Sequence, residues 1–114
     1  MNIVVKDDDF KKTYKRYHVE IDKTFRNLKN RLEAYREKGV TADRIFNDEK
    51  TIHGIINKKY YVYGDRLKTV KVRVLFVVDG EDIIVLSTYI KNRNNNMSNT
   101  DYLKQFNSIV SKLS

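Results

Sequence analysis

An uninterrupted helical periodicity over Phe10–Tyr35 constrains the fold of this chain more than any other feature of its sequence. Apolar residues recur three or four positions apart, at Phe10, Tyr14, Tyr17, Ile21, Phe25, Leu28, Leu32 and Tyr35. This spacing places all eight on one face of an α-helix. Asp7–Asp9 precede the pattern as candidate caps, and Gly39 follows it as a candidate stop. The sequence predicts one long helix, or two helices joined by a turn near Tyr17–Val19.

Short β-like segments precede and follow this helical stretch. Asn2–Lys6 is rich in β-branched residues and favours a first strand. Ile52–Tyr63 contains two short β-like pieces, with a turn at Asn57–Lys59, or forms one bent strand. Gly64–Lys68 is polar, so we expect it to connect this region to the next strand.

The second half of the chain predicts a hairpin. Thr69–Val78 and Asp82–Ile90 are strand-like, and Asp79-Gly80 between them is a strong turn signal. Asp82–Ile90 is apolar throughout its middle, which favours a central position in the sheet. After a polar, Asn-rich loop comes an apolar stripe at helical spacing, made of Tyr102, Leu103, Phe106, Ile109, Val110 and Leu113.

These elements predict an α+β fold in one domain spanning residues 1–114. We expect a small antiparallel sheet with an N-terminal helix or helical hairpin and a C-terminal helix, in the order β-α(α)-β-β-β-α. The helices would pack on a face of the sheet.

Composition narrows the possible functions of such a domain. The 114 residues include no Cys and two His, so we expect no disulfide, no cofactor and no metal centre. No secretory signal is visible and no apolar run is long enough to span a bilayer, so we expect a cytoplasmic protein without membrane contact. The formal charge is +8, and the basic excess lies before residue 79. This charge suggests a polyanionic partner.

Strand alternation suggests where that partner would bind. Along Thr69–Val78, Lys71 and Arg73 fall on one face, and the valines between them fall on the face that would meet the helices. Basic and aromatic residues precede this strand: Lys58, Lys59, Tyr60, Tyr61, Tyr63, Arg66 and Lys68. Cations neutralise phosphates and rings stack on unpaired bases, so the pattern is typical of an RNA surface. It is also typical of a solvated sheet face whose tyrosines merely favour strands.

Two further features extend this candidate site. Lys91 and Arg93 follow the last strand, where they would lie near the ends of the neighbouring strands or simply in a solvated loop. His53 lies in a β-like segment and could act as a general base near neutral pH, or be an ordinary strand residue.

The segment Val72–Ile90, V-R-V-L-F-V-V-D-G-E-D-I-I-V-L-S-T-Y-I, followed by Lys91-Asn92-Arg93, resembles the RelE/ParE/HigB group of bacterial toxins. In that group an arginine-bearing strand of the type Y-R-V-L-Y enters a hairpin, and the apolar return strand ends in a short basic segment before a final helix. Arg73 matches the strand arginine, and Lys91 and Arg93 match the basic segment. Gly54 followed by Tyr60–Tyr63 resembles the strand that precedes it.

The resemblance implies a toxin-like endoribonuclease that cleaves mRNA, in some members on the ribosome, and is neutralised by an antitoxin protein. Its chemistry is attack of the ribose 2′-OH on the adjacent phosphorus, without a metal. By position, Arg73 would stabilise the transition state and Lys91 and Arg93 would hold phosphates. The groups that would stack on bases or transfer protons are Tyr61 or Tyr63, Tyr89 or Tyr102, and His53.

A second hypothesis uses the same residues without catalysis. A basic protein of this size, for example one encoded by a mobile element, could bind nucleic acid or inhibit a nucleic-acid enzyme through the same face. It predicts salt-dependent binding without cleavage.

Overall fold

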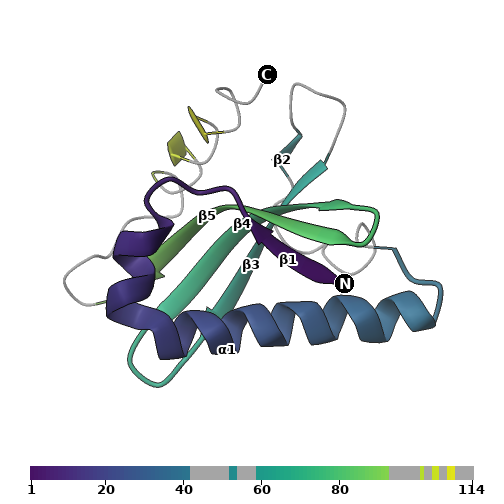
Figure 1. Cartoon of the computed structure of the whole chain (residues 1–114), viewed down its shortest axis with the longest axis horizontal. Helices are drawn as coiled ribbons and strands as arrows, with labels where there is room; N and C mark the ends of the chain where they lie inside the picture. Colours follow the sequence, from purple (N-terminus) through teal and green to yellow (C-terminus); the bar gives the residue numbers. More distant parts are fainter. Residues whose placement is uncertain (42–51, 54–58, 93–100, 102–103, 106–107, 110–114) are drawn as a thin grey trace.

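The fold was analysed in a computed structural model that describes residues 1–41, 52–53, 59–92, 101, 104–105 and 108–109. The elements, in chain order, are β1 (Asn2–Val5), α1 (Phe10–Glu37), β2 (Ile52–His53), β3 (Lys59–Arg66), β4 (Lys71–Asp79) and β5 (Asp82–Lys91) (Figure 1). The predicted α+β class is confirmed. The predicted C-terminal helix lies mostly outside the described residues.

Helix α1 bends at Tyr17, where the backbone leaves the helical region with φ −129° and ψ 35°. Figure 1 shows the result as a short arm, residues 10–16, set at a sharp angle to a long arm, residues 18–37. The turn that the sequence left open near Tyr17–Val19 is therefore present. The apolar stripe of the long arm is buried at Ile21, Leu28 and Leu32, whereas Tyr35, predicted on the same face, is 41% exposed beyond the sheet.

Aromatic rings hold the two arms of α1 at this angle. The ring of Phe10 on the short arm stacks on Phe25 of the long arm with 5.8 Å between centroids, and Tyr14 stacks on Phe10 at 5.2 Å. The Tyr14 hydroxyl donates to the Asp22 carboxylate across the bend, at 2.9 Å from Oδ1. A stripe of large side chains therefore stays continuous through the break, which is why the periodicity alone did not reveal it.

The two ends of α1 differ in how they are capped. At the C-terminal end Gly39 has φ 71°, and the N–H groups of Gly39 and Val40 donate to the carbonyls of Arg36 and Tyr35, both at 2.9 Å. This is a Schellman motif, and it confirms the predicted stop. At the N-terminal end, Asp9 makes no side-chain capping bond. Of the predicted caps Asp7–Asp9, Asp9 occupies the N-cap position without capping through its side chain.

Asp7 instead ties the start of α1 to the sheet. Its Oδ1 accepts from the Asp9 N–H at 3.1 Å and its Oδ2 accepts from the Thr88 N–H at 3.2 Å. Burial raises the pKa of the Asp7 carboxyl above its ordinary value of 3.8, although both hydrogen bonds act in the opposite direction. The half-buried carboxylate continues the hydrogen bonding of β5 beyond the end of β1.

The strand order is β1-β5-β4-β3-β2. β1 pairs with β5 in parallel, from Asn2 opposite Asp82 to Val5 opposite Val85, whereas the other neighbours are antiparallel. The sheet is therefore mixed, which corrects the prediction of a purely antiparallel sheet. Hydrophobic patterning marks which residues form strands but does not encode the direction in which two strands pair. β5 lies between β1 and β4, so its predicted central position is confirmed.

The predicted end of the strand at Tyr63 is wrong. β3 extends to Arg66, so Gly64, Asp65 and Arg66 are strand residues rather than a connection. β2 and β3 are separate strands paired antiparallel, with Ile52 opposite Tyr60, which confirms the two-piece interpretation. Gly80, with φ 59°, occupies the predicted turn between β4 and β5.

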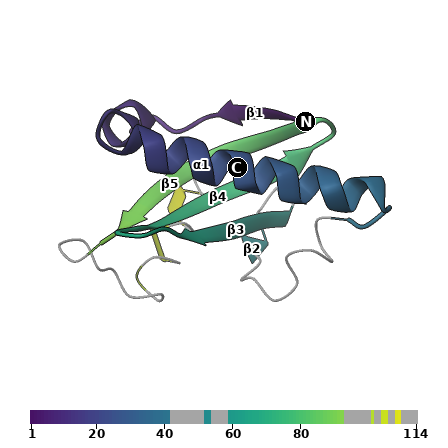
Figure 2. The same cartoon turned by 90° about the horizontal axis from the view of Figure 1, so that it is seen from below.

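The sheet has apolar clusters on both faces. The long arm of α1 packs on one face, hereafter the helix side (Figure 2). Its buried strand residues are Tyr61, Tyr63, Val72, Val74, Phe76, Ile83, Val85 and Ile90. The face opposite α1, hereafter the open side, carries a second cluster of Tyr60, Val62, Leu75, Val77, Leu86 and Tyr89, against which Ile109 packs.

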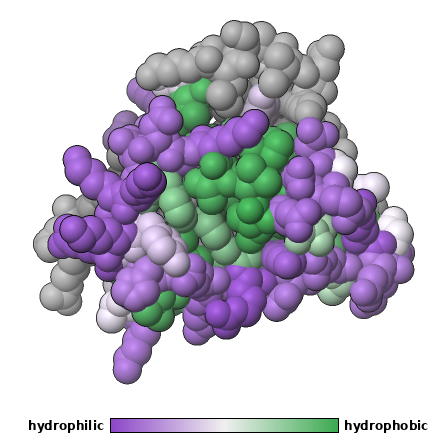
Figure 3. All heavy atoms as spheres, viewed as in Figure 1, coloured by the Kyte–Doolittle hydropathy of each residue, from purple (hydrophilic) through white to green (hydrophobic). Residues whose placement is uncertain are grey.

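The surface reflects this layering. Figure 3 shows polar side chains along α1 and an apolar area over β1 and its neighbours. Among the described residues, no helix has the length and apolarity needed to cross a membrane.

Candidate functional site

Three cations face one another across one end of the sheet. The register places Arg66 of β3 opposite Lys71 of β4, and Lys71 opposite Lys91 of β5. Alternation along β4 puts this row on the open side, because the neighbouring Val72 belongs to the helix-side core. Like charges directly opposite on adjacent strands are destabilising. A row of this kind attracts anionic ligands.

Arg73 lies in the next row on the same side, between Gly64 of β3 and Tyr89 of β5. The sequence predicted that Arg73 would face solvent or a ligand, but its side chain is not open to solvent: its exposed fraction is 6%, and that of Tyr89 is 9%. The prediction fails because the open side carries its own apolar cluster, which shields this row. The charge of Arg73 is therefore less screened by water than that of a surface arginine. We call Arg66, Lys71, Arg73 and Lys91 the cationic patch.

A glycine leaves room for one of these cations. A Cβ built on Gly64 would lie 2.8 Å from Cε of Lys71, closer than real contacts allow. The Lys71 side chain therefore leans across β3 over the Gly64 position, toward the row that contains Arg73. Because Gly64 has no side chain, the Lys71 side chain can occupy this position.

The strands add no carboxylate to this part of the open side. In β3, Asp65 faces the helix side, where its Oδ2 accepts from Nδ2 of Asn27 at 2.8 Å. In β4 and β5, Asp79 and Asp82 pair with each other at the far end, beside the hairpin turn. Within β3, β4 and β5, the end of the open side that holds the patch is uniformly positive.

Two predicted site residues do not belong to the patch. Tyr61 and Tyr63 lie on the helix side, 6% and 8% exposed, inside the core. Tyr61 packs on Phe76 with 5.6 Å between ring centroids. The expectation that they share a face with Lys71 and Arg73 is wrong. Tyrosines lie on both faces of β3, so the sequence does not show which of its residues face the core.

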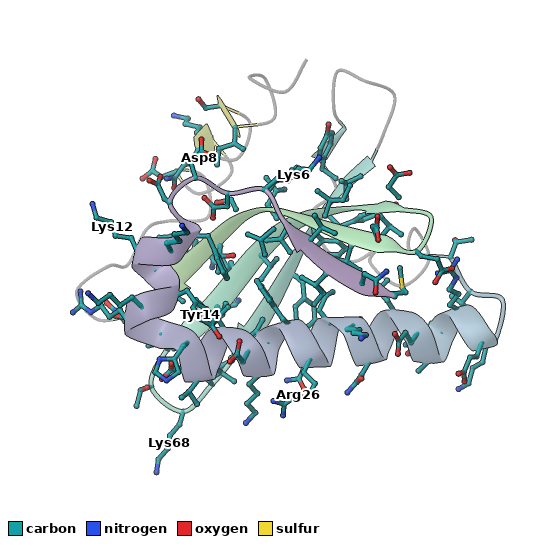
Figure 4. All side chains as sticks on the ribbon, viewed as in Figure 1. Lys6, Asp8, Lys12, Tyr14, Arg26 and Lys68 are labelled. Atoms are coloured by element: carbon teal, nitrogen blue, oxygen red, sulfur yellow. The ribbon has the colours of Figure 1, made fainter. Side chains whose placement is uncertain are left out.

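The remaining predicted residues are placed only in part. Lys68 is exposed on the β3–β4 connection, and Figure 4 shows it pointing away from the sheet. His53 pairs with Lys59 in the β2–β3 register, but the side chains of both lie outside the described part. Three predictions fall wholly outside the described residues, those on Lys58, Arg93 and Tyr102.

Sequence reasoning missed a cleft beside the patch. It has a volume of about 600 Å³ and lies between the short arm of α1 and the end of β5. Its lining residues are Lys12, Thr13, Arg16, Tyr17, Thr88, Tyr89, Ile90 and Asn92. The available signal was the run of cations Lys11, Lys12, Lys15 and Arg16 in the first turns of the predicted helix, where the helix dipole disfavours positive charge.

Searches of protein-family models, of curated proteins and of solved structures find no match to this chain.

Proposed function

We propose that this chain is an endoribonuclease of the RelE-like toxin type that holds RNA on the open side of its sheet. The observation that carries the proposal is the cationic patch, in which a cross-strand row of three like charges lies beside the buried Arg73. A phosphodiester chain is an anion long enough to span several strands, and its phosphates would meet the cations of this row.

The proposed reaction breaks one phosphodiester bond. The ribose 2′-oxygen attacks the adjacent phosphorus, the bond to the 5′-oxygen breaks, and the products carry a 2′,3′-cyclic phosphate and a 5′-hydroxyl. The attacking hydroxyl loses a proton to a base, and the leaving oxygen gains one from an acid. Negative charge accumulates on the phosphoryl oxygens at the transition state, where fixed cations stabilise it most.

The patch supplies named groups for these roles. Arg73 would contact the phosphoryl oxygens with its planar, two-pronged guanidinium. The row of Arg66, Lys71 and Lys91 would hold the flanking phosphates. Tyr89, directly opposite Arg73 in the register, would give a proton to the leaving oxygen. His53 remains the candidate base.

A toxin of this type would require a neutralising antitoxin protein, and its RNA would be mRNA, free or on the ribosome. A small reading frame next to the gene, encoding an antitoxin-like protein, would support this part of the proposal. Co-expression of the two would restore growth that the chain alone arrests.

The direct test measures binding and cleavage of a single-stranded RNA in EDTA. We expect discrete fragments with cyclic-phosphate ends from the unmodified chain. Arg73→Lys keeps the charge but removes the two-pronged geometry, so the cleavage rate should fall about 100- to 1,000-fold, as for loss of one transition-state donor. RNA affinity should change much less.

Tyr61→Phe is the control, because it alters a tyrosine of the same strand pair that faces the helix side. It should cleave at nearly the original rate. Tight binding without cleavage by the unmodified chain would support the non-catalytic hypothesis instead. Absence of any RNA binding at low salt would remove both.

A further inference from the structure

We propose that the cleft between the short arm of α1 and the end of β5 is a second phosphate-binding subsite for the RNA chain, with Lys12 and Arg16 as its phosphate ligands. This inference rests on the proposed RNA-binding function and extends it to a part of the molecule outside the patch.

The two cations of the cleft lie at positions where their own helix disfavours positive charge. Lys12 and Arg16 are four residues apart on the short arm, so they are neighbours of like charge, a spacing that destabilises a helix. They also lie near the positive end of the helix dipole; the first turn itself contains no acidic residue, and the nearest carboxylates, Asp7–Asp9, precede the helix. Both residues line the cleft, and Figure 4 shows Lys12 projecting from the short arm. A phosphate bound between the two cations would offset their mutual repulsion.

The bend of α1 shapes the floor of the cleft. Tyr17, the residue with the non-helical backbone, has its hydroxyl held by Nδ2 of Asn92 at 3.0 Å. The Arg16 guanidinium lies 5.6 Å from the centre of the Tyr17 ring. The short arm is thus fixed to the residue that directly follows β5, and its cations stay beside the end of that strand.

The cleft and the cationic patch meet at the end of β5. Tyr89 lines the cleft and is also the residue opposite Arg73. Lys91 of the patch directly precedes Asn92 of the cleft. An RNA chain on the patch can therefore pass the end of β5 and reach Lys12 and Arg16 without crossing the helix-side core. The cleft volume of about 600 Å³ falls in the range of small-molecule sites, roughly 300–1,000 Å³, which accommodates a nucleotide.

The test compares two double variants that remove the same charge from the same arm. Lys12→Gln with Arg16→Gln removes the cations of the cleft. Lys11→Gln with Lys15→Gln is the matched control, because both of these residues are exposed and neither lines the cleft. Affinity for fluorescent single-stranded RNAs of about four and about 12 nucleotides is measured by anisotropy over a range of salt concentrations.

With the longer RNA, the cleft variant should lower the slope of log K against log salt by about 1.4, the loss of two phosphate contacts. The control variant should lower it by less than half as much. The difference between the two variants should shrink with the shorter RNA. Equal losses in both variants with the longer RNA would overturn the subsite and leave the proposed function standing. Failure of the unmodified chain to bind RNA would overturn both.

Discussion

The two sides of the sheet use the same strands in different ways. On the helix side, apolar residues of β3, β4 and β5 pack against α1 in one cluster, and Asp65 of β3 bonds to Asn27 of the helix. On the open side, the intervening residues form an apolar cluster at one end and the cationic patch at the other. The alternation along the strands thus keeps the cations of the patch on the side opposite α1, although Arg73 and the apolar residues of that side are also buried. Predictions that treat the sides separately test this division.

The largest effect is expected from truncating the helix-side core. Phe76→Ala removes a fully buried ring that packs on Tyr61, so the free energy of unfolding should fall by about 3–5 kcal/mol. Urea denaturation followed by circular dichroism measures it. Leu75→Ala, the adjacent residue on the open side and equally buried, is the comparison and should cost less. A larger loss for Leu75→Ala would show that the open side carries the main core.

A smaller effect of opposite sign is expected in the patch. Lys91→Gln relieves repulsion by Lys71, so the free energy of unfolding at low salt should rise by about 0.2–1 kcal/mol. The same change should weaken RNA binding and reduce its salt slope by about 0.7. Lys68→Gln removes a charge that points away from the sheet. It should change both the free energy of unfolding and RNA binding less than Lys91→Gln does. A lower stability of Lys91→Gln would mean that this lysine serves the fold rather than a ligand.

The smallest effect concerns the link between the start of α1 and β5. Because burial raises the pKa of Asp7 in the folded state, the folded chain holds this proton more tightly than the unfolded chain does. The contribution of Asp7 to stability should therefore fall as pH rises from 3.8 through the raised pKa, and stay level above it.

Asp7→Asn should remove this part of the pH dependence, measured as the unfolding midpoint in urea between pH 3 and pH 7, roughly the range in which carboxyl groups titrate. Asp8 is an exposed neighbour, and Asp8→Asn makes the same change of charge. It should alter the dependence of the unfolding midpoint on pH less than Asp7→Asn does. An unchanged slope in Asp7→Asn would contradict the assignment.

Much of the fold followed from local signals in the sequence. The α1 stripe, the Gly39 stop and the turn at Gly80 depend on neighbouring residues, so periodicity and backbone preference predicted them. The parallel pairing of β1 and the tie from Asp7 to Thr88 depend on residues far apart in the chain. No local pattern encodes such contacts.

Only part of the candidate site could be predicted from the sequence, because it too depends on contacts between distant residues. Lys71 and Arg73 were assigned to one side of β4 because valines mark the alternate positions. In β3, tyrosines on both faces of the strand concealed the alternation of core and outer residues. Tyr61 and Tyr63 were therefore predicted on the wrong side. The burial of Arg73 depends on the second apolar cluster, and the cleft depends on the bend at Tyr17, so both require the tertiary structure.

The parallel pairing of β1 with β5 has a consequence for the order of assembly. β3, β4 and β5 are consecutive antiparallel strands, so short loops suffice to bring them together, whereas β1 must wait for the last of them. Contacts between distant parts of a chain form slowly. During synthesis on the ribosome, α1 emerges after β1 but before β3, β4 and β5. We expect the cationic patch to assemble within the strand meander first, and the docking of β1 to complete the fold.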